Sequence, residues 1–407
     1  MQKQQQIVVI GGGAAGFFAA ISAANHHPEA TVMLLEKSNK LLAKVRVSGG
    51  GRCNVTHHCF ENRNLAKFYP RGERFLKKAF EHFSVKDTVA WFENRGVALA
   101  TESDNRMFPS TNTSQTIVDT LIGAALDAGV QIRMNTQVQS LKPQDGTFLV
   151  ETNSETIQAQ KVIVASGGSP KKEGLLWLEK LGHQIENPVP SLFTFNLPKQ
   201  DITQLMGVSV AKVGVKLQGS KLQSEGPLLI THWGLSGPAI LKLSAFGARE
   251  LADKNYRFHF QVNWLGALKE HDLRSTLDDL LAEVKKRKVS NRNPFELPSR
   301  LWEYLLQRSE IDPDKPWQEL SKKAINKLIN ALLNDVYEAN GKTTFKEEFV
   351  TAGGVSLEDV DPNTMMSRVV PNLYFAGEVL DIDGVTGGFN FQAAWTTGFV
   401  AGVGGLQ

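Results

Sequence analysis

The chain has 407 residues, of which 42% are hydrophobic and 21% charged, as in an ordinary globular protein, and this length favours two or three domains over one core. Two cysteines exclude a disulfide framework and fit a reducing compartment, while a net charge of +3 is too small to indicate a nucleic-acid-binding protein by itself. There is no evident signal peptide or run of about twenty uncharged apolar residues, so we expect a cytoplasmic protein without a membrane partner.

The first predicted feature is a nucleotide-binding βαβ unit. The apolar run Ile7–Ile10 has the character of a strand and leads into an alanine-rich helix. Between them, Gly11, Gly13 and Gly16 form the pattern G-x-G-x-x-G. In this pattern the first glycine permits a tight turn, the second lets a pyrophosphate approach the backbone, and the third lets the helix pack on the strand. The helix N-terminus would offer N–H groups and a positive dipole to the phosphates.

A second strand follows in the segment TVMLLEK and ends at Glu36. This acid lies about twenty residues past the last glycine, where an acidic side chain binds a ribose diol and disfavours a 2′-phosphate. We therefore expect a dinucleotide, with Lys37 beside the same site. A βαβ unit without a ligand is the alternative.

The segment SGGGRCNVTHHC brings three glycines, an arginine and both cysteines together. Glycines let a backbone approach a ligand closely, an arginine can hold an anion, and paired cysteines can form a redox disulfide. Pyridine-nucleotide disulfide reductases have a shorter cysteine spacing and a second G-x-G-x-x-G for NAD(P)H. Here residues 54–58 separate Cys53 from Cys59, and we find no second pattern of that kind after a strand. Both features argue against that class.

Further along, TLIGAALDAGVQIRMNTQVQSL predicts a helix and a strand near the adenine, and KVIVASGGSP predicts a strand that ends at Gly167 and Gly168. After PVPSLFTFNLP, alternating runs such as VSVAKVGVKLQ and YRFHFQVNW predict antiparallel strands of a small barrel or sandwich. From about Ala267 to Asn340, apolar residues recur at three- and four-residue spacing. We expect helices there, including one through WQELSKKAINKLINALLNDVYEA.

The last segment, PNLYFAGEVLDIDGVTGGFNFQAAWTTGFVAG, predicts a strand, a glycine-rich turn and a helix that begins near Gly388. In two-dinucleotide-type flavoproteins, such a strand, acid and helix return to the first nucleotide fold and hold the flavin end of FAD. An NAD-only Rossmann domain does not need them. We therefore expect an FAD domain built from both termini. The alternative is a strand and helix that only complete an α/β layer.

Five segments make the chain resemble the BaiN/YhiN-like bacterial flavoproteins, often labelled the aminoacetone oxidase family. They are KVRVSGGGRCNVT, NRMFPSTNTSQTIVD, THWGLSGPAIL, TAGGVSLEDVDPNTMMSR and YFAGEVLDIDGVTGGFNFQAAWTTG, and the resemblance covers nearly the whole chain. It implies an α/β fold in which a Rossmann-like FAD domain of the two-dinucleotide type is divided by an inserted antiparallel β-barrel and a helical subdomain. The expected domains are 1–190 and 349–407 for FAD, 191–266 for the barrel and 267–348 for the helices. Arg46, before the glycine triplet, departs from many members of the family, in which a smaller apolar residue is common there, and this could alter access near the flavin.

The resemblance also implies a set of FAD contacts. Ala15 and Gly16 would lie at the pyrophosphate, and the backbone of Val138 at the adenine. Arg52 would lie near a phosphate or the electron-rich edge of the flavin, and the helix from Gly388 would point its N-terminus at the pyrimidine side of the ring. The full expected set is Gly11, Gly13, Ala15, Gly16, Glu36, Lys37, Ser48, Gly49, Gly50, Gly51, Arg52, Asn54, Val138, Gly167, Gly377, Glu378, Asp383, Gly388, Asn390 and Phe391.

Activities attached to the family include amine oxidation, reduction of conjugated steroid enones and reduction of uracil in ribosomal RNA. We expect an FAD-dependent oxidoreductase that passes a hydride to or from a small molecule, with NADH or NADPH as a transient donor. Reduction of uracil to dihydrouridine in ribosomal RNA and a non-catalytic flavin-binding redox module are the alternatives. Cys53 and His232 are the candidate catalytic residues, although a buried cysteine can be inert and the THWGLSGP loop can serve only to pack domains. No metal is expected, and the oligomeric state stays open.

An RNA substrate would require basic residues around the entrance to the flavin, because the target base must leave its stack while the backbone phosphates are held. The candidates are Lys285 to Lys288, Arg292, Lys322 and Lys323 in the helical region, and Arg71, Arg74, Lys77 and Lys78 after the glycine triplet. Against RNA, 45 basic residues stand beside 42 acidic ones and no recognised RNA-binding motif is present. Small-molecule chemistry therefore comes first.

Overall fold

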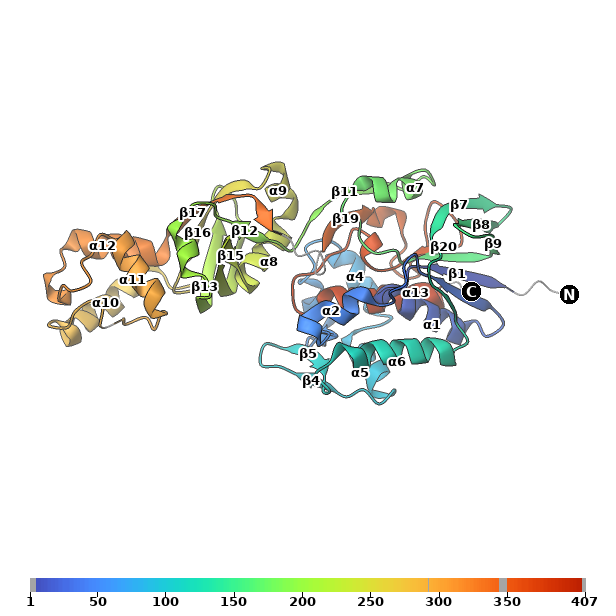
Figure 1. The fold of residues 1–407 in the computed structure, drawn as a ribbon, viewed down its shortest axis with the longest axis horizontal. Coiled ribbons are helices and arrows are strands. Elements are labelled where there is room, and N and C mark those ends of the chain that lie inside the picture. The colour runs from blue at the N-terminus through green and yellow to red at the C-terminus, as the bar shows by residue number, and fades with distance from the viewer. Residues whose placement is uncertain (1–4, 292, 344–349, 405–407) are drawn as a thin grey trace. The chain divides into compact units, whose positions relative to one another are not determined.

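The computed structural model describes residues 5–291, 293–343 and 350–404, without the side chains of 279–284 (Figure 1). The chain divides into two compact units, Met1–Ser191 with Phe345–Gln407 and Leu192–Thr344. The first unit is therefore built from both ends of the chain, and the second is inserted between them. Arg292, one of the basic residues considered for RNA, lies outside the described residues.

A five-stranded parallel sheet organises the first unit, in the order β20-β10-β1-β2-β6. Its strands are β1 (Gln6–Ile10), β2 (Thr31–Leu35), β6 (Gln131–Arg133), β10 (Lys161–Val164) and β20 (Leu373–Phe375). The central strands are continuous apolar runs, as is typical of parallel strands covered on both faces. The chain runs outward from β1 through β2 to β6, and then returns to the other side of β1 as β10. The carboxyl ends of β1 and β10 therefore form a topological switch point, where α/β sheets bind ligands.

The rest of the first unit consists of helices and small antiparallel sheets around this parallel sheet (Figure 1). The helices are α1 (Ala14–His26), α2 (Ala43–Gly51), α3 (Asn62–Ala66), α4 (Glu73–Ala79), α5 (Val85–Glu93), α6 (Ser114–Asp127), α7 (Leu176–Glu179) and α13 (Phe389–Val403). The antiparallel strands are β3 (Thr56–His57) with β5 (Arg106–Pro109) and β4 (Leu99–Thr101), β7 (Val138–Gln144) with β8 (Thr147–Thr152) and β9 (Thr156–Ala159), and β11 (Ile185–Pro190) with β19 (Thr351–Val355).

Glycines bring α1 and α13 into close backbone contact. A Cβ on Gly398 would lie 2.5 Å from the carbonyl oxygen of Ala15, and a Cβ on Gly402 would lie 2.5 Å from that of Ala19. Only a residue without a side chain allows this approach. Because the two contacts advance in the same direction along both helices, α1 and α13 run parallel, and their N-termini face the same edge of the sheet.

The second unit is built around a seven-stranded antiparallel sheet in the order β17-β16-β13-β14-β15-β12-β18. The end strands β17 and β18 are separated in sequence by Gly341 alone, and the amide of Asn196 donates to the carbonyl of Gly341 (3.2 Å), so the sheet curls back on itself as the expected barrel. The strands are β12 (Thr194–Asn196), β13 (Ser209–Leu217), β14 (Gln223–Thr231), β15 (Gly234–Ser236), β16 (Arg257–Asn263), β17 (Asp335–Asn340) and β18 (Lys342–Thr343). The helices are α8 (Pro238–Phe246), α9 (Ala248–Asp253), α10 (Glu270–Val284), α11 (Ser299–Arg308) and α12 (Lys322–Leu333).

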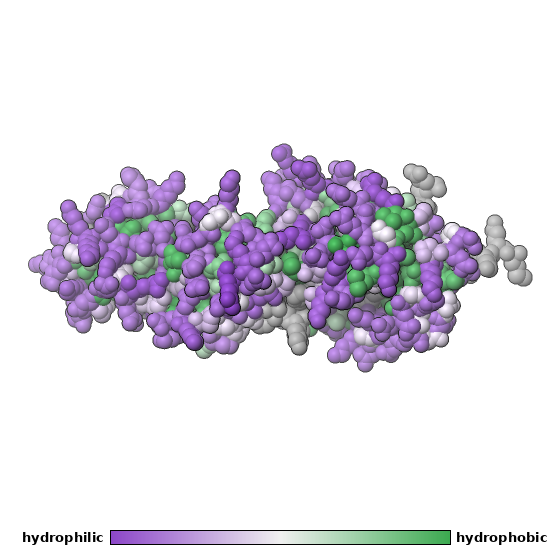
Figure 2. Space-filling view, turned by 90° about the horizontal axis from the view of Figure 1, so that it is seen from above, coloured by the Kyte–Doolittle hydropathy of each residue, from purple (hydrophilic) through white to green (hydrophobic). Residues whose placement is uncertain are grey.

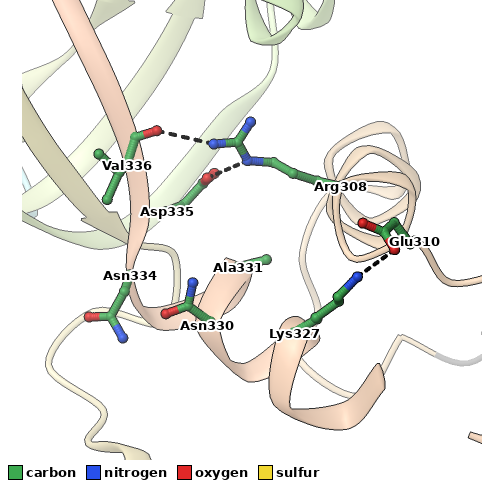
Figure 3. Close-up of a pocket in the computed structure, with 8 residues that line it drawn as sticks. All are labelled: Arg308, Glu310, Lys327, Asn330, Ala331, Asn334, Asp335 and Val336. Carbon is green, nitrogen blue, oxygen red and sulfur yellow. Dashed lines mark hydrogen bonds and ion pairs between the residues drawn. The ribbon is translucent and has the colours of Figure 1, made fainter. Parts of the chain in front are cut away.

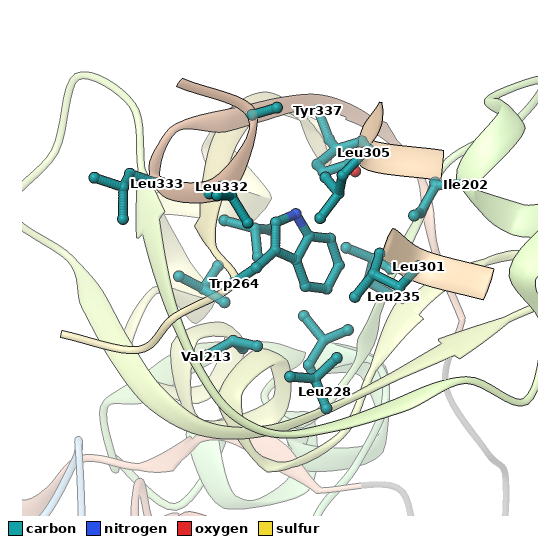
Figure 4. Packing of buried hydrophobic residues seen from close by; sticks show 14 of the residues in the cluster. Ile202, Val213, Leu228, Leu235, Trp264, Leu301, Leu305, Leu332, Leu333 and Tyr337 are labelled. Carbon is teal, nitrogen blue, oxygen red and sulfur yellow. The ribbon is translucent and has the colours of Figure 1, made fainter. Parts of the chain in front are cut away.

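The core of this unit surrounds Trp264, which follows β16 and is 1% exposed. Its indole lies among Leu301, Leu305 and Leu332 from the helices and Leu228 from the barrel (Figure 4). Barrel and helices therefore share one hydrophobic core, in which large apolar side chains contribute most of the buried area.

Strand β17 corrects the sequence prediction. Helical spacing was expected through Ala339, but α12 ends at Leu333 and Asp335–Asn340 form a strand paired with β16. Residues of β17 alternate between buried and exposed, which is the period of a strand. Buried Asp335 accepts hydrogen bonds from Trp264 (3.0 Å), Arg308 (2.6 Å) and Tyr337. Trp264 and Arg308 are distant from Asp335 in the sequence, and contacts of this kind decide between a helical and a strand period in so short a segment.

None of the described helices combines the length and apolar character needed to cross a membrane. On the face shown in Figure 2, hydrophilic side chains cover most of the surface and hydrophobic ones form small groups. Large exposed hydrophobic side chains include Phe60, Leu126 and Met206. Scattered apolar side chains of this kind are normal on a protein surface.

Candidate functional site

The turn after β1 is packed as only glycine allows. Gly11 has φ +116°, and a Cβ there would lie 2.3 Å from the carbonyl oxygen of Ala165 at the end of β10. A Cβ on Gly16 would lie 1.8 Å from the carbonyl oxygen of Gly11. A Cβ on Gly13, in contrast, would meet no atom within 4 Å. Gly11 and Gly16 therefore close the turn, and Gly13 faces open space.

The N-terminus of α1 presents backbone donors at this open space. Its N-cap residue is Gly13, and within the described residues no side chain caps the helix. The amide of Phe17 is the first to bond back to Gly13 (3.0 Å), so the amides of Ala14, Ala15 and Gly16 have no acceptor within the helix. Such an end binds phosphate groups.

Glu36, at the end of β2, lies beside the same turn. Its carboxylate accepts from the amide of Gly12 (2.9 Å), the amide of Ser38 (2.8 Å) and the hydroxyl of Ser38 (2.7 Å). A carboxylate has about four acceptor positions, so Glu36 can accept from one further hydroxyl group while these three bonds hold its orientation. Lys37 is exposed, and Val138 begins β7 with partial exposure.

The glycine triplet forms a sharp turn with one bare side. Ser48 leaves helical geometry with ψ 149°, and Gly49, Gly50 and Gly51 have φ of 58°, 69° and 84°. A Cβ on Gly49 would lie 2.8 Å from the ring of Phe108, whereas a Cβ on Gly50 or Gly51 would meet no atom within 4 Å. The triplet therefore exposes backbone over which a flat ligand can lie.

Arg52 and Arg46, on either side of the triplet, are bound to other side chains. The guanidinium of Arg52 is 2.6 Å from the carboxylate of Glu102 and 4.0 Å from the ring centroid of Phe108. Arg46 is exposed and donates to the side chain of Gln115 on α6 (2.6 Å). Sequence reasoning did not foresee Glu102 or Phe108, because both come from the distant β4–β5 hairpin.

The N-terminus of α13 is a second helix end whose N-cap residue offers no capping side chain, and the amides of Phe389, Asn390 and Phe391 have no acceptor within the helix, because the amide of Gln392 is the first to bond back (3.0 Å). Its N-cap residue is Gly388, with φ +90°. With the Asn54 side-chain amide in the orientation that satisfies both of its polar atoms, its oxygen accepts from the backbone amide of Gly388 (2.9 Å). Its nitrogen then donates to the carbonyl of Thr56 (3.0 Å). Since Ala15 lies opposite Gly398, α13 begins about eight residues before the point level with the start of α1. The two helix ends are thus on the order of 12 Å apart along one direction.

Glu378 joins several segments near the end of β20. It forms an ion pair with Lys44 (2.6 Å) and accepts from the amide of Thr351 (2.9 Å). A Cβ on Gly168 would lie 2.8 Å from the carboxyl carbon of Glu378, so these groups are in direct contact. Lys44 and Thr351 were missed by the sequence analysis, which has no signal for partners so far apart.

Asp383 and Asn390 point into the protein. Asp383 is 0% exposed and accepts from the guanidinium of Arg71 and the hydroxyl of Ser191. Burial raises the pKa of Asp383, and the Arg71 charge offsets part of that rise. The side-chain oxygen of Asn390 accepts from the N–H of Gly384 (2.8 Å), and its side-chain nitrogen donates to the carbonyl of Gly384 (2.9 Å). Both side chains therefore shape the loop before α13.

The remaining expected contacts lie close to these elements. Gly167 follows β10 with φ +76° and open space around it. Gly377 has φ +75°, and a Cβ there would lie 2.7 Å from the Cβ of Ala15, so the end of β20 packs on α1. Phe391 stacks on Trp395 within α13, with ring centroids 5.5 Å apart.

The two candidate catalytic residues lie in different units. Cys53 is 0% exposed, and burial raises the pKa of its thiol to about 12, which argues against a thiolate in catalysis. Cys53 and Cys59 are both free thiols. His232 is exposed in the second unit, with its ring 4.1 Å from that of Trp233. Among the described residues, no group of three or more His, Cys, Asp or Glu side chains could hold a metal ion.

The basic residues considered for RNA differ in their surroundings. Arg71 is committed to Asp383, and Lys288 pairs with Asp314 (2.8 Å). The exposed cations on α4 are Arg74, Lys77 and Lys78, and those in the helical region are Lys285, Lys286, Arg287, Lys322 and Lys323.

A hollow of about 420 Å³ lies in the second unit (Figure 3). Arg308 of α11 donates to Asp335 (2.6 Å) and to the carbonyl of Val336 (3.1 Å), and Lys327 of α12 pairs with Glu310. Each of these two cationic side chains is thus paired with an acidic side chain. It is built from elements other than those that carry the glycine turns, and we assign it no part in nucleotide binding.

Comparisons with known proteins agree with this architecture. The family model described as the HI0933-like protein Rossmann domain matches residues 5–404. A ribosomal RNA dihydrouridine synthase of Escherichia coli (strain K12) is 30% identical over 375 residues, which are 90% of each chain. A 3-dehydro-bile acid delta(4,6)-reductase of Clostridium scindens is 27% identical over 382 residues, 92% of each chain. The structure of a 3-ketosteroid-delta4-(5alpha)-dehydrogenase from Rhodococcus jostii RHA1 matches with a TM-score of 0.50 and 13% identity, covering 98% of this chain and 96% of that one, and shows the fold alone.

The buried thiol makes a testable difference between the two cysteines. With a pKa of about 12, Cys53 is about 10⁻⁴ ionised at pH 8, and this fraction rises tenfold per pH unit below 12. In native protein at pH 8, iodoacetamide followed by peptide mass spectrometry should therefore label the partly exposed Cys59 and leave Cys53 unmodified. Denatured protein should be labelled at both positions, which serves as the control. Rapid labelling of Cys53 in the native protein would contradict the described burial.

Proposed function

The chain belongs to the HI0933-like family of Rossmann-fold flavoprotein oxidoreductases, and from this premise we propose that it uses FAD to reduce a carbon–carbon double bond conjugated to a carbonyl group. The observation that carries the proposal is the pair of helix N-termini at Gly13 and Gly388, whose first-turn amides have no acceptor within the helix and which face one edge of the parallel sheet. An extended dinucleotide with two electron-rich groups can engage both ends at once.

In this proposal the chain holds FAD mainly with backbone. The free amides of α1 would hold the pyrophosphate at the open surface of Gly13, and Glu36 would bind the adenosine ribose. The bare backbone of Gly50 and Gly51 would lie along the flavin ring. The N-terminus of α13 would face the pyrimidine side of the ring, where a positive dipole stabilises the negative charge of the reduced state. The open space at these glycines supports the fit.

The substrate class is inferred from the chemistry that the relatives' names share. Formation of dihydrouridine saturates a ring bond conjugated to a uracil carbonyl, and a delta(4,6)-reductase of a 3-dehydro bile acid saturates bonds conjugated to its oxo group. The flavin, once reduced, would supply the hydride to the carbon β to the carbonyl and return to oxidised FAD, and a proton taken up from solvent would be added at the α carbon. NADH or NADPH would reduce the flavin as a transient donor.

Gly13→Ala tests FAD binding separately from folding. The new methyl group meets no protein atom within 4 Å, so the thermal midpoint should change little, but it occupies the space assigned to the pyrophosphate. We expect the Kd for FAD to rise at least about tenfold, or about 1.4 kcal/mol, in a flavin fluorescence titration. Gly123→Ala on α6 also meets no atom within 4 Å and is the matched control, with an unchanged Kd. Equal Kd values for the two variants would count against this site.

Half-reactions test the chemistry. Under anaerobic conditions, NADH or NADPH should bleach the flavin absorbance, and an α,β-unsaturated ketone should then restore it with formation of the saturated ketone, identified by mass spectrometry. The saturated ketone is the control acceptor and should leave the flavin reduced. A flavin that neither donor reduces would instead favour a non-catalytic redox module.

Uracil in ribosomal RNA is a second candidate substrate. It is favoured by the 30% identity with a ribosomal RNA dihydrouridine synthase, and the exposed Arg74, Lys77 and Lys78 on α4 offer cations for phosphates.

A deletion strain, examined by mass spectrometry of digested ribosomal RNA, tests this second candidate. Loss of a dihydrouridine that the wild-type gene restores would support it. A variant with Arg74, Lys77 and Lys78 changed to Glu should restore less of the nucleoside, because reversed charges repel phosphates, while its reduction of a small enone stays unchanged. An unchanged nucleoside profile in the deletion strain would remove RNA and leave the small-molecule reaction.

A further inference from the structure

We propose that Arg71, Asp383 and Ser191 form a buried clamp that positions the loop leading into α13, and with it the helix N-terminus at the flavin. The three residues act as positioning residues and do not themselves bind the cofactor. The functional part of this inference rests on the proposed binding of FAD, whereas the structural part does not.

The clamp begins with the complete burial of Asp383. Its carboxylate is 0% exposed and receives two N–H donors from Arg71, one on each oxygen, and a third hydrogen bond from the hydroxyl of Ser191. Arg71 also donates to the Ser191 oxygen (3.3 Å). Two parallel bonds to one carboxylate fix both the distance and the orientation of the pair. Asp383 is therefore held on all sides by protein groups.

Backbone contacts carry this constraint along the loop. Arg71 and Asp383 also form an antiparallel β-bridge, and the amide of Val385 donates to the carbonyl of Phe68 (3.0 Å). The hydroxyl of Tyr69 donates to the carbonyl of Phe389 in the first turn of α13 (2.7 Å). Residues 68–71 thus run beside residues 383–389, and the ion pair lies at the far end of this contact from the helix.

Ser191 ties the clamp to the boundary of the first unit. It is the last residue of that unit before the inserted segment, and its amide donates to the carbonyl of Val350 (2.9 Å), where the chain is described again after the insertion. The outgoing and returning parts of the chain therefore meet beside Asp383.

Asp383→Asn tests the clamp, because it keeps the side-chain size but leaves Arg71 without its counter-charge. In hydrogen exchange of the full chain without added FAD, residues 384–391 should exchange at least about tenfold faster, since the loop loses its anchor. With FAD, the Kd should rise by at least about tenfold. Ser191→Ala, which keeps the ion pair, is the milder variant and should change both values in the same direction by about twofold to threefold.

The matched control removes a contact with the opposite end of α13, made by Lys161 at the start of β10. Lys161 is 8% exposed and donates to the carbonyl of Gly404 after α13 (3.2 Å). Lys161→Met should lower the thermal midpoint while leaving the exchange of residues 384–391 and the Kd for FAD near the wild-type values. A general loss of stability would instead affect Asp383→Asn and Lys161→Met alike.

The outcomes separate this inference from the proposed function. Unchanged exchange at residues 384–391 in both clamp variants, or faster exchange with an unchanged Kd for FAD, would overturn the clamp as a positioning device. If the wild-type protein itself binds no FAD in the same titration, the proposed function fails, and the exchange data alone decide whether the clamp holds the loop.

Discussion

The close contact between α1 and α13 is the constraint on which the first unit depends. Gly398 and Gly402 remove the side chains that would separate the helices, so their backbones touch over more than one turn. This contact joins the two ends of the chain and turns both helix N-termini toward the edge of the sheet where β1 and β10 end. The insertion of a whole second unit leaves this arrangement intact, because the chain leaves at Ser191 and is paired again at Val350.

In this packing, the backbone faces the space open to a ligand, and the nearby polar side chains hold the backbone in place. Backbone faces the open space at Gly13, Gly50 and Gly51, whereas the polar side chains nearby bind other parts of the protein. Glu36 holds the turn after β1, and Asn54 holds the start of α13. Side chains that satisfy backbone groups in this way preorganise the site, so less conformational freedom is lost when a ligand binds.

Burial separates groups that look alike in the sequence. Cys53 lies in the turn expected at the flavin, yet its thiol is enclosed and its pKa is raised to about 12. Arg71 and Arg74 are close neighbours in sequence, but the first is bound to buried Asp383 and the second is exposed on α4. A charged side chain inside a protein needs a partner, so the first serves structure while the second remains available to a ligand.

Glycine spacing and hydrophobic period are local properties, and by themselves they determined the β1–α1–β2 unit and the antiparallel strands of the inserted region. The return of the C-terminal segment to the first unit and the choice of a barrel over a sandwich came from the resemblance to known flavoproteins. The sequence also indicated the family, through motifs in the same order along the chain. The tertiary structure alone decided that Asp335–Asn340 form a strand, that Arg52 pairs with Glu102 and that Asp383 is enclosed by Arg71 and Ser191. These features depend on partners far apart in the chain, and no local pattern encodes which distant side chain a buried charge will meet.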